Sequence, residues 1–220
     1  MSDARKAILA RLKKACPKQD EEAIAARLAR HPRNLVPKRA QAAGEEARAL
    51  FIHMARSAAA TLEEIGSAAA IVPAVARYLA AEGLPARLRL ALDPLLAGLD
   101  WPGLETATGA AAAGDAAALS VAFCAIAETG TLMMVSGPDN PVSLDFLPGH
   151  HIVVLPQERI LGAYEDAWDR LRRHMGEGAM PRAVNWITGP SRTADIEQTL
   201  VLGAHGPRKL HILLTGEETS

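Results

Sequence analysis

The chain is short of cysteine, aromatic residues and long apolar runs. Its two cysteines, Cys16 and Cys124, lie far apart and form no CxxC pair, and aromatic residues make up only 4% of the sequence. A thiolate-held zinc ion, an iron–sulfur cluster within the chain and a disulfide framework are therefore disfavoured, which indicates a reducing, cytoplasmic location. No apolar stretch approaches the roughly 20 residues that span a bilayer, and residues 1–6 lack the apolar segment of a secretory signal.

Several common motifs are also missing. The sequence has no GxGxxG, no Walker loop and no GxSxG elbow, so it gives no support for a dinucleotide site, an ATP site or serine hydrolase chemistry. His150 and His151 are adjacent, and in a strand they would point to opposite faces. We therefore expect no metal site.

Charge is unevenly distributed along the chain. Residues 1–50 carry 12 Lys and Arg against 6 Asp and Glu, whereas the remainder carries 12 against 19. A basic segment beside an acidic body can dock on a partner or fold back on that body. It has no interleaved aromatic residues and no known motif, so we expect no nucleic-acid partner. With 49% hydrophobic residues, the chain suits a basic helical arm over 1–44 and one domain over 45–220.

Apolar periodicity predicts helices first and alternating elements later. Helices are expected around Ile8 and Leu12, over 21–30 and over 41–65, and Pro73 suits the first residue of a further helix ending at Ala81. Beyond it, strands are expected over 86–91, 104–108, 117–122, 132–136, 151–155, 184–188 and 210–214, with a helical turn over 123–127 and a helix over 163–174. Apolar strands separated by helices predict an α/β domain with a mostly parallel sheet covered on both faces.

The stretch 185–207 is the most informative part of the chain. An apolar run ends in Thr188-Gly189-Pro190, after which Ser191 or Thr193 suits the cap of a helix that Gly203 ends. Ligands of parallel sheets bind outside the carboxyl ends of the strands. We therefore expect 188–190 to lie at such an edge.

Arg192 makes this turn a candidate anion site. Free backbone N–H groups at a helix start, beside a guanidinium, suit a carboxylate or a phosphate. Asp195 and Glu197 would occupy the first turn, where the helix dipole favours negative charge. The alternative is an ordinary capped turn in which Arg192 pairs with Asp195 or Glu197.

A second candidate is Glu128-Thr129-Gly130-Thr131, just ahead of an apolar strand. The glycine gives a flexible turn, and the threonines supply hydroxyl groups. The Glu128 carboxylate could act as a base, as a nucleophile or as a partner for Arg192. The alternative is a solvent-facing turn residue. His205 follows the expected helix and titrates in the useful range, although a turn histidine without a role is equally compatible with the pattern.

The order of these motifs resembles the lactate-utilisation protein C family, also called the LUD domain, over roughly residues 45–215. The resemblance rests on Ala127-Glu128-Thr129-Gly130-Thr131, Leu147-Pro148 with His151-Ile152-Val153-Val154, Thr188-Gly189-Pro190-Ser191-Arg192-Thr193-Ala194-Asp195-Ile196-Glu197, and Gly203-Ala204-His205-Gly206-Pro207. It implies a doubly wound sheet of the sugar-phosphate isomerase and CoA-transferase type. The residues over 1–44 match nothing in the family.

The resemblance also implies a function. It points to a subunit that supports oxidation of L-lactate to pyruvate, with iron–sulfur clusters held only in partner proteins and no cofactor in this chain. Alternatives are a stand-alone enzyme of the CoA-transferase or isomerase kind using Glu128, and a non-catalytic ligand-binding module. The motif positions give the candidate ligand site: Glu128, Thr129, Gly130, Thr131, Gly189, Ser191, Arg192, Thr193, Asp195, Glu197, His205 and Gly206.

Overall fold

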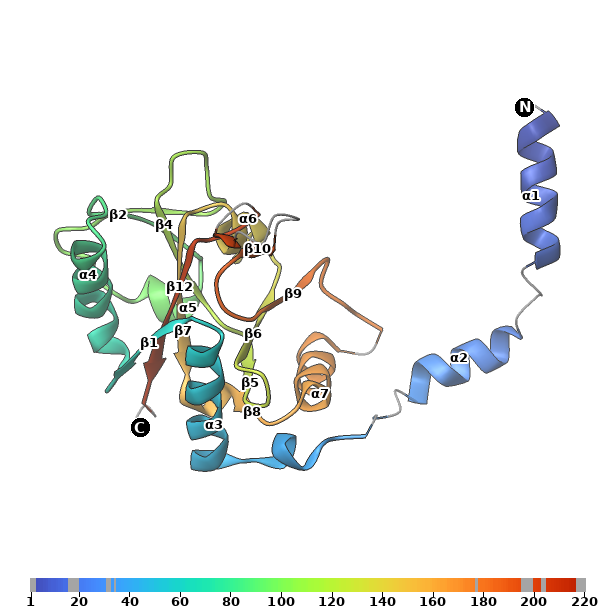
Figure 1. Ribbon diagram of the computed structural model, residues 1–220, viewed down its shortest axis with the longest axis horizontal. Helices are drawn as coiled ribbons and strands as arrows, with labels where there is room; N and C mark the ends of the chain where they lie inside the picture. The colour runs from blue at the N-terminus through green and yellow to red at the C-terminus, as the bar shows by residue number, and fades with distance from the viewer. Residues whose placement is uncertain are drawn as a thin grey trace. The chain divides into compact units, whose positions relative to one another are not determined.

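The computed structural model describes residues 3–15, 20–30, 33, 35–176, 178–194, 200–202 and 205–216. Contacts divide the chain into two units, Met1–Leu35 and Val36–Ser220 (Figure 1). This division falls nine residues before the boundary expected from the sequence after residue 44. Among the described helices, none is long and apolar enough to cross a membrane.

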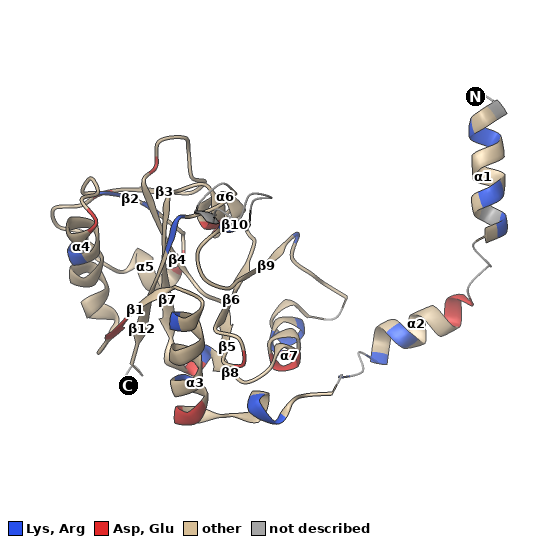
Figure 2. Ribbon diagram, viewed as in Figure 1, with Lys and Arg blue, Asp and Glu red and all other residues tan. Residues whose placement is uncertain are grey.

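The first unit consists of two amphipathic helices, α1 (Asp3–Ala15) and α2 (Glu21–Arg30). Ile8, Leu9 and Leu12 of α1 and Leu28 of α2 are exposed. Figure 2 shows basic residues along α1. Both helices lie where the apolar spacing predicts them.

The second unit is built on a six-stranded parallel sheet, here called the main sheet, with strand order β1-β12-β7-β4-β2-β3. Its strands are β1 (Thr61–Ile65), β2 (Arg87–Leu90), β3 (Glu105–Thr108), β4 (Ala117–Val121), β7 (His150–Pro156) and β12 (Lys209–Thr215). The central strands are apolar on both faces, as buried parallel strands require. The α/β fold with a mostly parallel sheet, as predicted, is confirmed.

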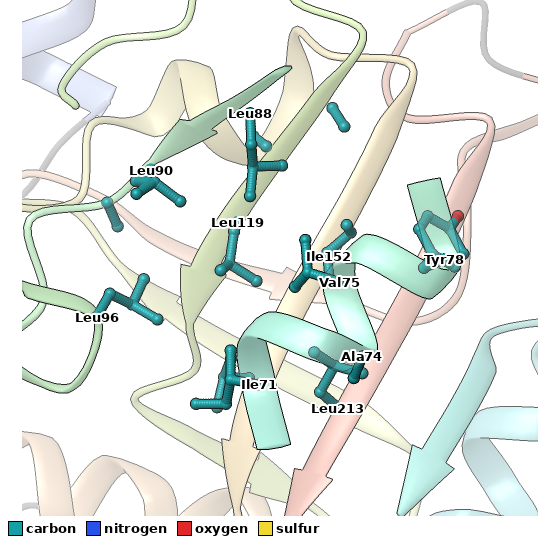
Figure 3. Close-up of a cluster of buried hydrophobic side chains, with 14 of the residues drawn as sticks. Ile71, Ala74, Val75, Tyr78, Leu88, Leu90, Leu96, Leu119, Ile152 and Leu213 are labelled. Atoms are coloured by element: carbon teal, nitrogen blue, oxygen red, sulfur yellow. The ribbon is translucent and has the colours of Figure 1, made fainter. Parts of the chain in front are cut away.

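Alternate residues of the central strands serve two different cores. Ile152 and Val154 of β7 face α4 (Ile71–Ala81) and the short helix α5 (Pro94–Ala97), where they pack with Leu119 and Leu213 (Figure 3). Val153 points to the other face, toward α3 (Gly44–Ser57). This alternation follows from the two-residue period of a strand.

A second sheet, here called the small sheet, shares that other face with α3. Its order is β8-β5-β6-β9, formed by β5 (Cys124–Ile126), β6 (Thr131–Val135), β8 (Ile160–Leu161) and β9 (Val184–Ile187). Leu132 and Met134 of β6 pack toward the main sheet, whereas Met133 packs with Leu171 of α7 (Tyr164–Met175) on the outer face. The layers are therefore α4 and α5, the main sheet, α3 with the small sheet, and α7.

The remaining elements are short. They are the 3-10 turns η1 (Lys38–Gln41), η2 (Ala68–Ala70) and η3 (Gln157–Arg159), the helix α6 (Val142–Phe146), and the paired strands β10 (Arg192–Ala194) and β11 (Leu200–Leu202).

Two of the elements expected from the sequence are wrong. The helix expected over 41–65 ends at Ser57, and its last residues form β1. The helical turn expected over 123–127 is strand β5.

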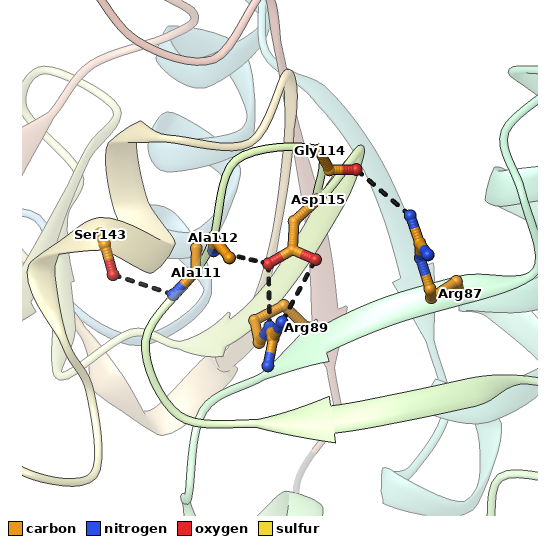
Figure 4. Close-up of polar contacts among 7 residues, drawn as sticks. All are labelled: Arg87, Arg89, Ala111, Ala112, Gly114, Asp115 and Ser143. Atoms are coloured by element: carbon orange, nitrogen blue, oxygen red, sulfur yellow. Dashed lines mark hydrogen bonds and ion pairs between the residues drawn. The ribbon is translucent and has the colours of Figure 1, made fainter.

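The loop between β3 and β4 is fastened by one carboxylate (Figure 4). Asp115 accepts hydrogen bonds from Arg89 Nε at 2.9 Å and from the Ala112 N–H at 2.8 Å. The bond from Arg89 holds the pKa of Asp115 below its ordinary value. Earlier in the loop, the Ala111 N–H donates to Ser143 Oγ at 2.9 Å, which ties the loop to α6.

Candidate functional site

The two stretches that the sequence singles out lie side by side. Strand β6 pairs antiparallel with β9, so the loop that leads into β6 meets the residues that follow β9. The hydroxyl oxygens of Thr131 and Thr188 are 2.7 Å apart, and those of Thr129 and Thr131 are also 2.7 Å apart. The Tyr164 hydroxyl of α7 joins both loop threonines at 2.9 and 3.0 Å. These threonines therefore connect two loops and a helix.

Both stretches use glycine to approach the end of α3. Gly130 has a φ of 66°, and a Cβ there would lie 2.3 Å from the Ala55 nitrogen. Gly189 has a φ of 71°, and a Cβ there would lie 2.0 Å from the Ala58 oxygen. A side chain at either position would meet backbone that cannot move away as a flexible side chain can. The two glycines thus have a packing role that requires no ligand.

The helix expected after Ser191 is wrong. Arg192 opens strand β10, which pairs with β11, and the Ser191 N–H donates to the Pro207 oxygen at 2.9 Å. The capping roles and the helix-dipole argument therefore do not apply here. Thr193 lies in β10, and the segment that holds Asp195 and Glu197 is outside the described residues.

Arg192 is exposed, and its Nη2 donates to the Ala58 oxygen at 3.2 Å. This oxygen belongs to the carboxyl end of α3, where the helix dipole favours a cation. A guanidinium has five N–H donors, so this bond, taken with the described residues alone, leaves donors for an anion. The Arg192 guanidinium remains a candidate for binding an anion, although β10 stands where the helix was expected.

Glu128 has a different partner from the one considered above. Its Oε1 accepts a hydrogen bond from Arg39 Nε at 3.0 Å, and its side chain is only 10% exposed. Nearby, a Cβ at Gly162 would lie 2.2 Å from the Ala40 oxygen, so the segment around Arg39 packs closely on the small sheet. Glu128 therefore holds the segment around Arg39 against the domain. It is not among the residues that line the pocket described next.

A pocket of about 280 Å³, here called the acid pocket, lies beside Arg192. It is lined by Asp145 and Phe146 of α6, His151, residues 186–192, residues 205–207 and Leu210. His151 and Leu210 are the second residues of β7 and β12. The pocket therefore opens at the amino edge of the main sheet. The expected place for 188–190, at the carboxyl edge of a parallel sheet, is wrong because β9 belongs to the small sheet.

The inner wall of the acid pocket is polar and buried. Asp145 is 1% exposed, and His151 is fully buried. Asn185 Nδ2 donates to Asp145 Oδ2 at 3.0 Å, and Ser120 Oγ lies 2.7 Å from His151 Nε2. That same imidazole nitrogen is 3.6 Å from Asp145 Oδ1, which is too long for a hydrogen bond.

Burial shifts both titrating groups of this wall toward their neutral forms. Desolvation raises the pKa of Asp145 to about 7, although the bond from Asn185 opposes the rise. Desolvation also lowers the pKa of His151 to about 3. Within the described part of the protein, Asp145 Oδ1 and His151 Nδ1 have no hydrogen-bond partner. A carboxyl group with a pKa of about 7 and an unpaired oxygen can donate a hydrogen bond to a small polar ligand or accept one from it.

The structure therefore regroups the candidate residues. Thr188, Gly189, Ser191, Arg192, His205 and Gly206 line the acid pocket, whereas Glu128, Thr129, Gly130 and Thr131 lie behind it. The sequence interpretation missed Asp145, Asn185 and Ser120. A usable signal existed for Asp145, a carboxylate between Leu144 and Phe146 in an apolar turn.

Comparisons with known proteins agree with this architecture. The LUD domain family model matches residues 38–215. Proteins named lactate utilization protein C are 38% identical over 84 residues in Shouchella clausii and 38% over 93 residues in Bacillus subtilis. These matches cover 38% and 42% of this chain, and only 37% and 39% of the relatives.

A crystal structure supports the same fold. It is that of a DUF162 family protein from Deinococcus radiodurans, with a TM-score of 0.58 and 22% identity, and the match covers 78% of this chain and 98% of that one. At this identity the likeness concerns the fold alone. The family-model match, in contrast, spans most of the chain. The protein belongs to the LUD domain family.

Proposed function

We propose that this protein acts in lactate utilisation, and that its acid pocket binds a small 2-hydroxy or 2-oxo carboxylate such as L-lactate or pyruvate. The names of the relatives support the first part. The second part depends on one observation, the placement of a guanidinium and a buried acid around one small cavity. A volume of about 280 Å³ is sufficient for a small acid, and it lies at the lower end of the roughly 300–1,000 Å³ of small-molecule sites.

The two ends of such a ligand match the two sides of the pocket. A guanidinium pairs with a carboxylate through parallel N–H donors, so Arg192 at the exposed side suits the carboxylate end. The 2-hydroxyl or 2-oxo oxygen would then face the unpaired Oδ1 of Asp145. Because its pKa is raised to about 7, Asp145 repels a bound carboxylate less than an ordinary aspartate would.

Iron–sulfur proteins complete the proposal as partners. Oxidation of L-lactate to pyruvate releases two electrons and two protons, which require an acceptor. A cluster is commonly held by four thiolates, and this sequence has two cysteines. Of these, Cys124 is fully buried in the small sheet, where desolvation raises its pKa to about 12. We therefore assign the acceptors to partner proteins, and this chain the role of an accessory, carboxylate-binding cytoplasmic subunit.

A stand-alone enzyme using Glu128 receives less support from the geometry. Its carboxylate is paired with Arg39, behind the pocket. The accessory role remains the proposal because the pocket residues named above can hold a ligand without Glu128.

Substitution of Arg192 tests the proposed ligand. We expect the Arg192→Gln protein to bind L-lactate and pyruvate about ten- to a hundredfold more weakly in calorimetric titrations, because a charged hydrogen bond contributes about 1.5–3 kcal/mol. Arg182→Gln is the matched control, since Arg182 is exposed just before β9 and does not line the pocket. Equal affinity in both variants, or no binding of either acid to the wild type, would refute the assignment.

A further inference from the structure

A second and larger cavity, here called the arginine cavity, lies elsewhere in the domain and is independent of the acid pocket. Its volume is about 750 Å³. Its lining includes Val121, the last residue of β4, together with Asp93, three residues after β2, and Arg159, three residues after β7. The cavity therefore opens at the carboxyl edge of the main sheet, opposite to the acid pocket.

The topology of the main sheet makes this position significant. From β2 the chain moves outward to β3, and it then crosses back to β4 and continues in the other direction through β7 to β12. The direction of winding thus reverses between β2 and β4, the strands whose ends contribute Asp93 and Val121. Open parallel sheets bind ligands at the carboxyl ends of the strands where the winding reverses.

Positive charge gathers at this cavity from two elements. Arg159 comes from η3, and its Nη1 donates to the Ala122 oxygen at 2.9 Å, which holds the side chain at the end of β4. Arg170 and Arg173 come from α7, whose basic residues are visible in Figure 2. The Arg170 guanidinium carbon lies 5.7 Å from the centre of the Phe123 ring.

Acidic groups oppose this charge only in part. Asp93 and Asp139 also line the cavity, but Asp93 Oδ1 already accepts a hydrogen bond from the Leu95 N–H at 2.9 Å, and Asp139 is exposed. Three arginines against two aspartates leave an excess of positive charge, even with His174 neutral. The excess lies on arginine, whose charge persists at every pH in ordinary use.

The cavity also contains an unpaired acceptor and an apolar wall. Asn140 Nδ2 donates to the Val135 oxygen at 3.3 Å, whereas Asn140 Oδ1 is buried and has no partner in the described structure. A ligand hydroxyl or amino group would satisfy this oxygen, and burial without one is costly. Phe123, with the His174 ring 5.3 Å away, and Met175 add apolar surface.

We propose that the arginine cavity binds a phosphorylated, hydroxyl-bearing small molecule of nucleotide size. The forked donors of Arg170 and Arg173 match the oxygens of a phosphate group. The amide oxygen of Asn140 accepts a hydrogen bond from a hydroxyl group of the ligand. The apolar part of the ligand packs on Phe123. A volume of about 750 Å³ is far larger than inorganic phosphate needs and lies within the range of cavities that enclose a whole cofactor-sized ligand.

Titration with AMP, pyrophosphate, inorganic phosphate and adenosine tests this proposal on the full chain. We expect AMP and pyrophosphate to bind more tightly than inorganic phosphate, and adenosine to bind least, because the arginines recognise phosphate oxygens. Arg173→Gln should weaken AMP binding about tenfold, and the Arg170→Gln/Arg173→Gln protein should weaken it further. Arg172→Gln, on the same helix but outside the lining, should leave it unchanged.

Two readouts keep the outcome separate from folding and from the acid pocket. Melting curves without ligand show whether a variant is folded, and Arg173 serves as the safer position because its side chain is exposed. Lactate affinity should be unchanged in Arg173→Gln, and AMP affinity should be unchanged in Arg192→Gln. Absence of binding by all three phosphate probes, or equal AMP affinity in the wild type and the double variant, would overturn the proposal.

Discussion

The two edges of the main sheet carry cavities of opposite character. At the amino edge, the acid pocket is small. Its inner wall contains Asp145 and His151, and burial shifts the pKa of each toward favouring its uncharged form. At the carboxyl edge, the arginine cavity is larger and carries permanent positive charge on Arg159, Arg170 and Arg173. One sheet can therefore offer two kinds of site, one governed by pH and shape and the other by fixed charge.

The acid pocket depends on close packing against α3, and this dependence gives the largest expected effect. Gly189→Ala should reduce the free energy of unfolding by roughly 2–6 kcal/mol, because backbone strain and overpacking each cost about 1–3 kcal/mol. The new Cβ would lie 2.0 Å from the Ala58 oxygen. Urea denaturation measures the loss.

Gly176→Ala is the matched control for this substitution. Gly176 also has a positive φ, of 86°, but a Cβ there would meet nothing within 4 Å. Its variant should lose only the cost of strain, about 1–3 kcal/mol. Equal losses at the two positions would mean that the contact with α3 contributes little to the pocket.

The neutral wall of the acid pocket predicts a dependence of stability on pH. An unfolded aspartate ionises near pH 3.8, whereas the folded Asp145 has its pKa raised to about 7. The stabilising contribution of neutral Asp145 is therefore complete below about pH 4 and is lost as the pH rises to about 7. Relative to Asp145→Asn, the wild type should lose up to about 4 kcal/mol over this interval. Denaturation curves at a series of pH values provide the test.

His151 contributes with the opposite sign. Its folded pKa is lowered to about 3, so the stability it provides is present above about pH 6.5 and is lost as the pH falls. In the wild type the two groups oppose each other between about pH 4 and 6.5, and Asp145→Asn should reveal the histidine contribution. A difference between the two proteins that stays constant with pH would contradict the raised pKa of Asp145.

The loop between β3 and β4 gives the smallest expected effect and sharpens the contrast between the edges. Asp115→Ala should cost about 1–2 kcal/mol of stability, because it removes a partly buried bond to Arg89 and one to the Ala112 N–H. The same loop is bonded to Ser143 of α6, the helix that carries Asp145. Calorimetry should therefore show weaker lactate binding with AMP binding unchanged.

Arg87→Ala serves as the control for the loop. Arg87 is exposed, and its Nη2 donates to the Gly114 oxygen at 3.3 Å. Its loss should change stability by less than about 0.5 kcal/mol. If AMP binding fell together with lactate binding in Asp115→Ala, the two edges would not be independent.

The sequence predicts the main sheet well because its strands have strong local signals. The run of β-branched and apolar residues over 151–155 indicates a buried strand in any context, and β7 lies there. The residues over 200–202 are different, since three apolar residues satisfy a helix face and a strand equally. Pairing with β10 decides in favour of a strand, and no local rule contains that information. At residues 58–65, Ala59 adopts a φ of 64°, which ends the helix without a glycine signal.

The polar wall of the acid pocket was missed for a related reason. Asp145 is unusual only because α6 packs against β4 and β7, and Asn185, its hydrogen-bond donor, is 40 residues away. Burial of this kind depends on contacts that are distant in sequence. Glycine and proline mark the turn around Arg192 locally, whereas nothing in the sequence connects Glu128 to Arg39.

Trp186 lines the acid pocket and contacts α7, and this arrangement has an optical consequence. Its ring lines the acid pocket and lies 5.5 Å from that of Trp168 and 4.9 Å from that of Tyr164, both on α7. Arg170 and Arg173 extend from the same helix into the other cavity. We therefore expect the fluorescence of Trp186 and Trp168 to change with occupancy of the acid pocket and with shifts of α7, which would serve as a spectroscopic probe without any label.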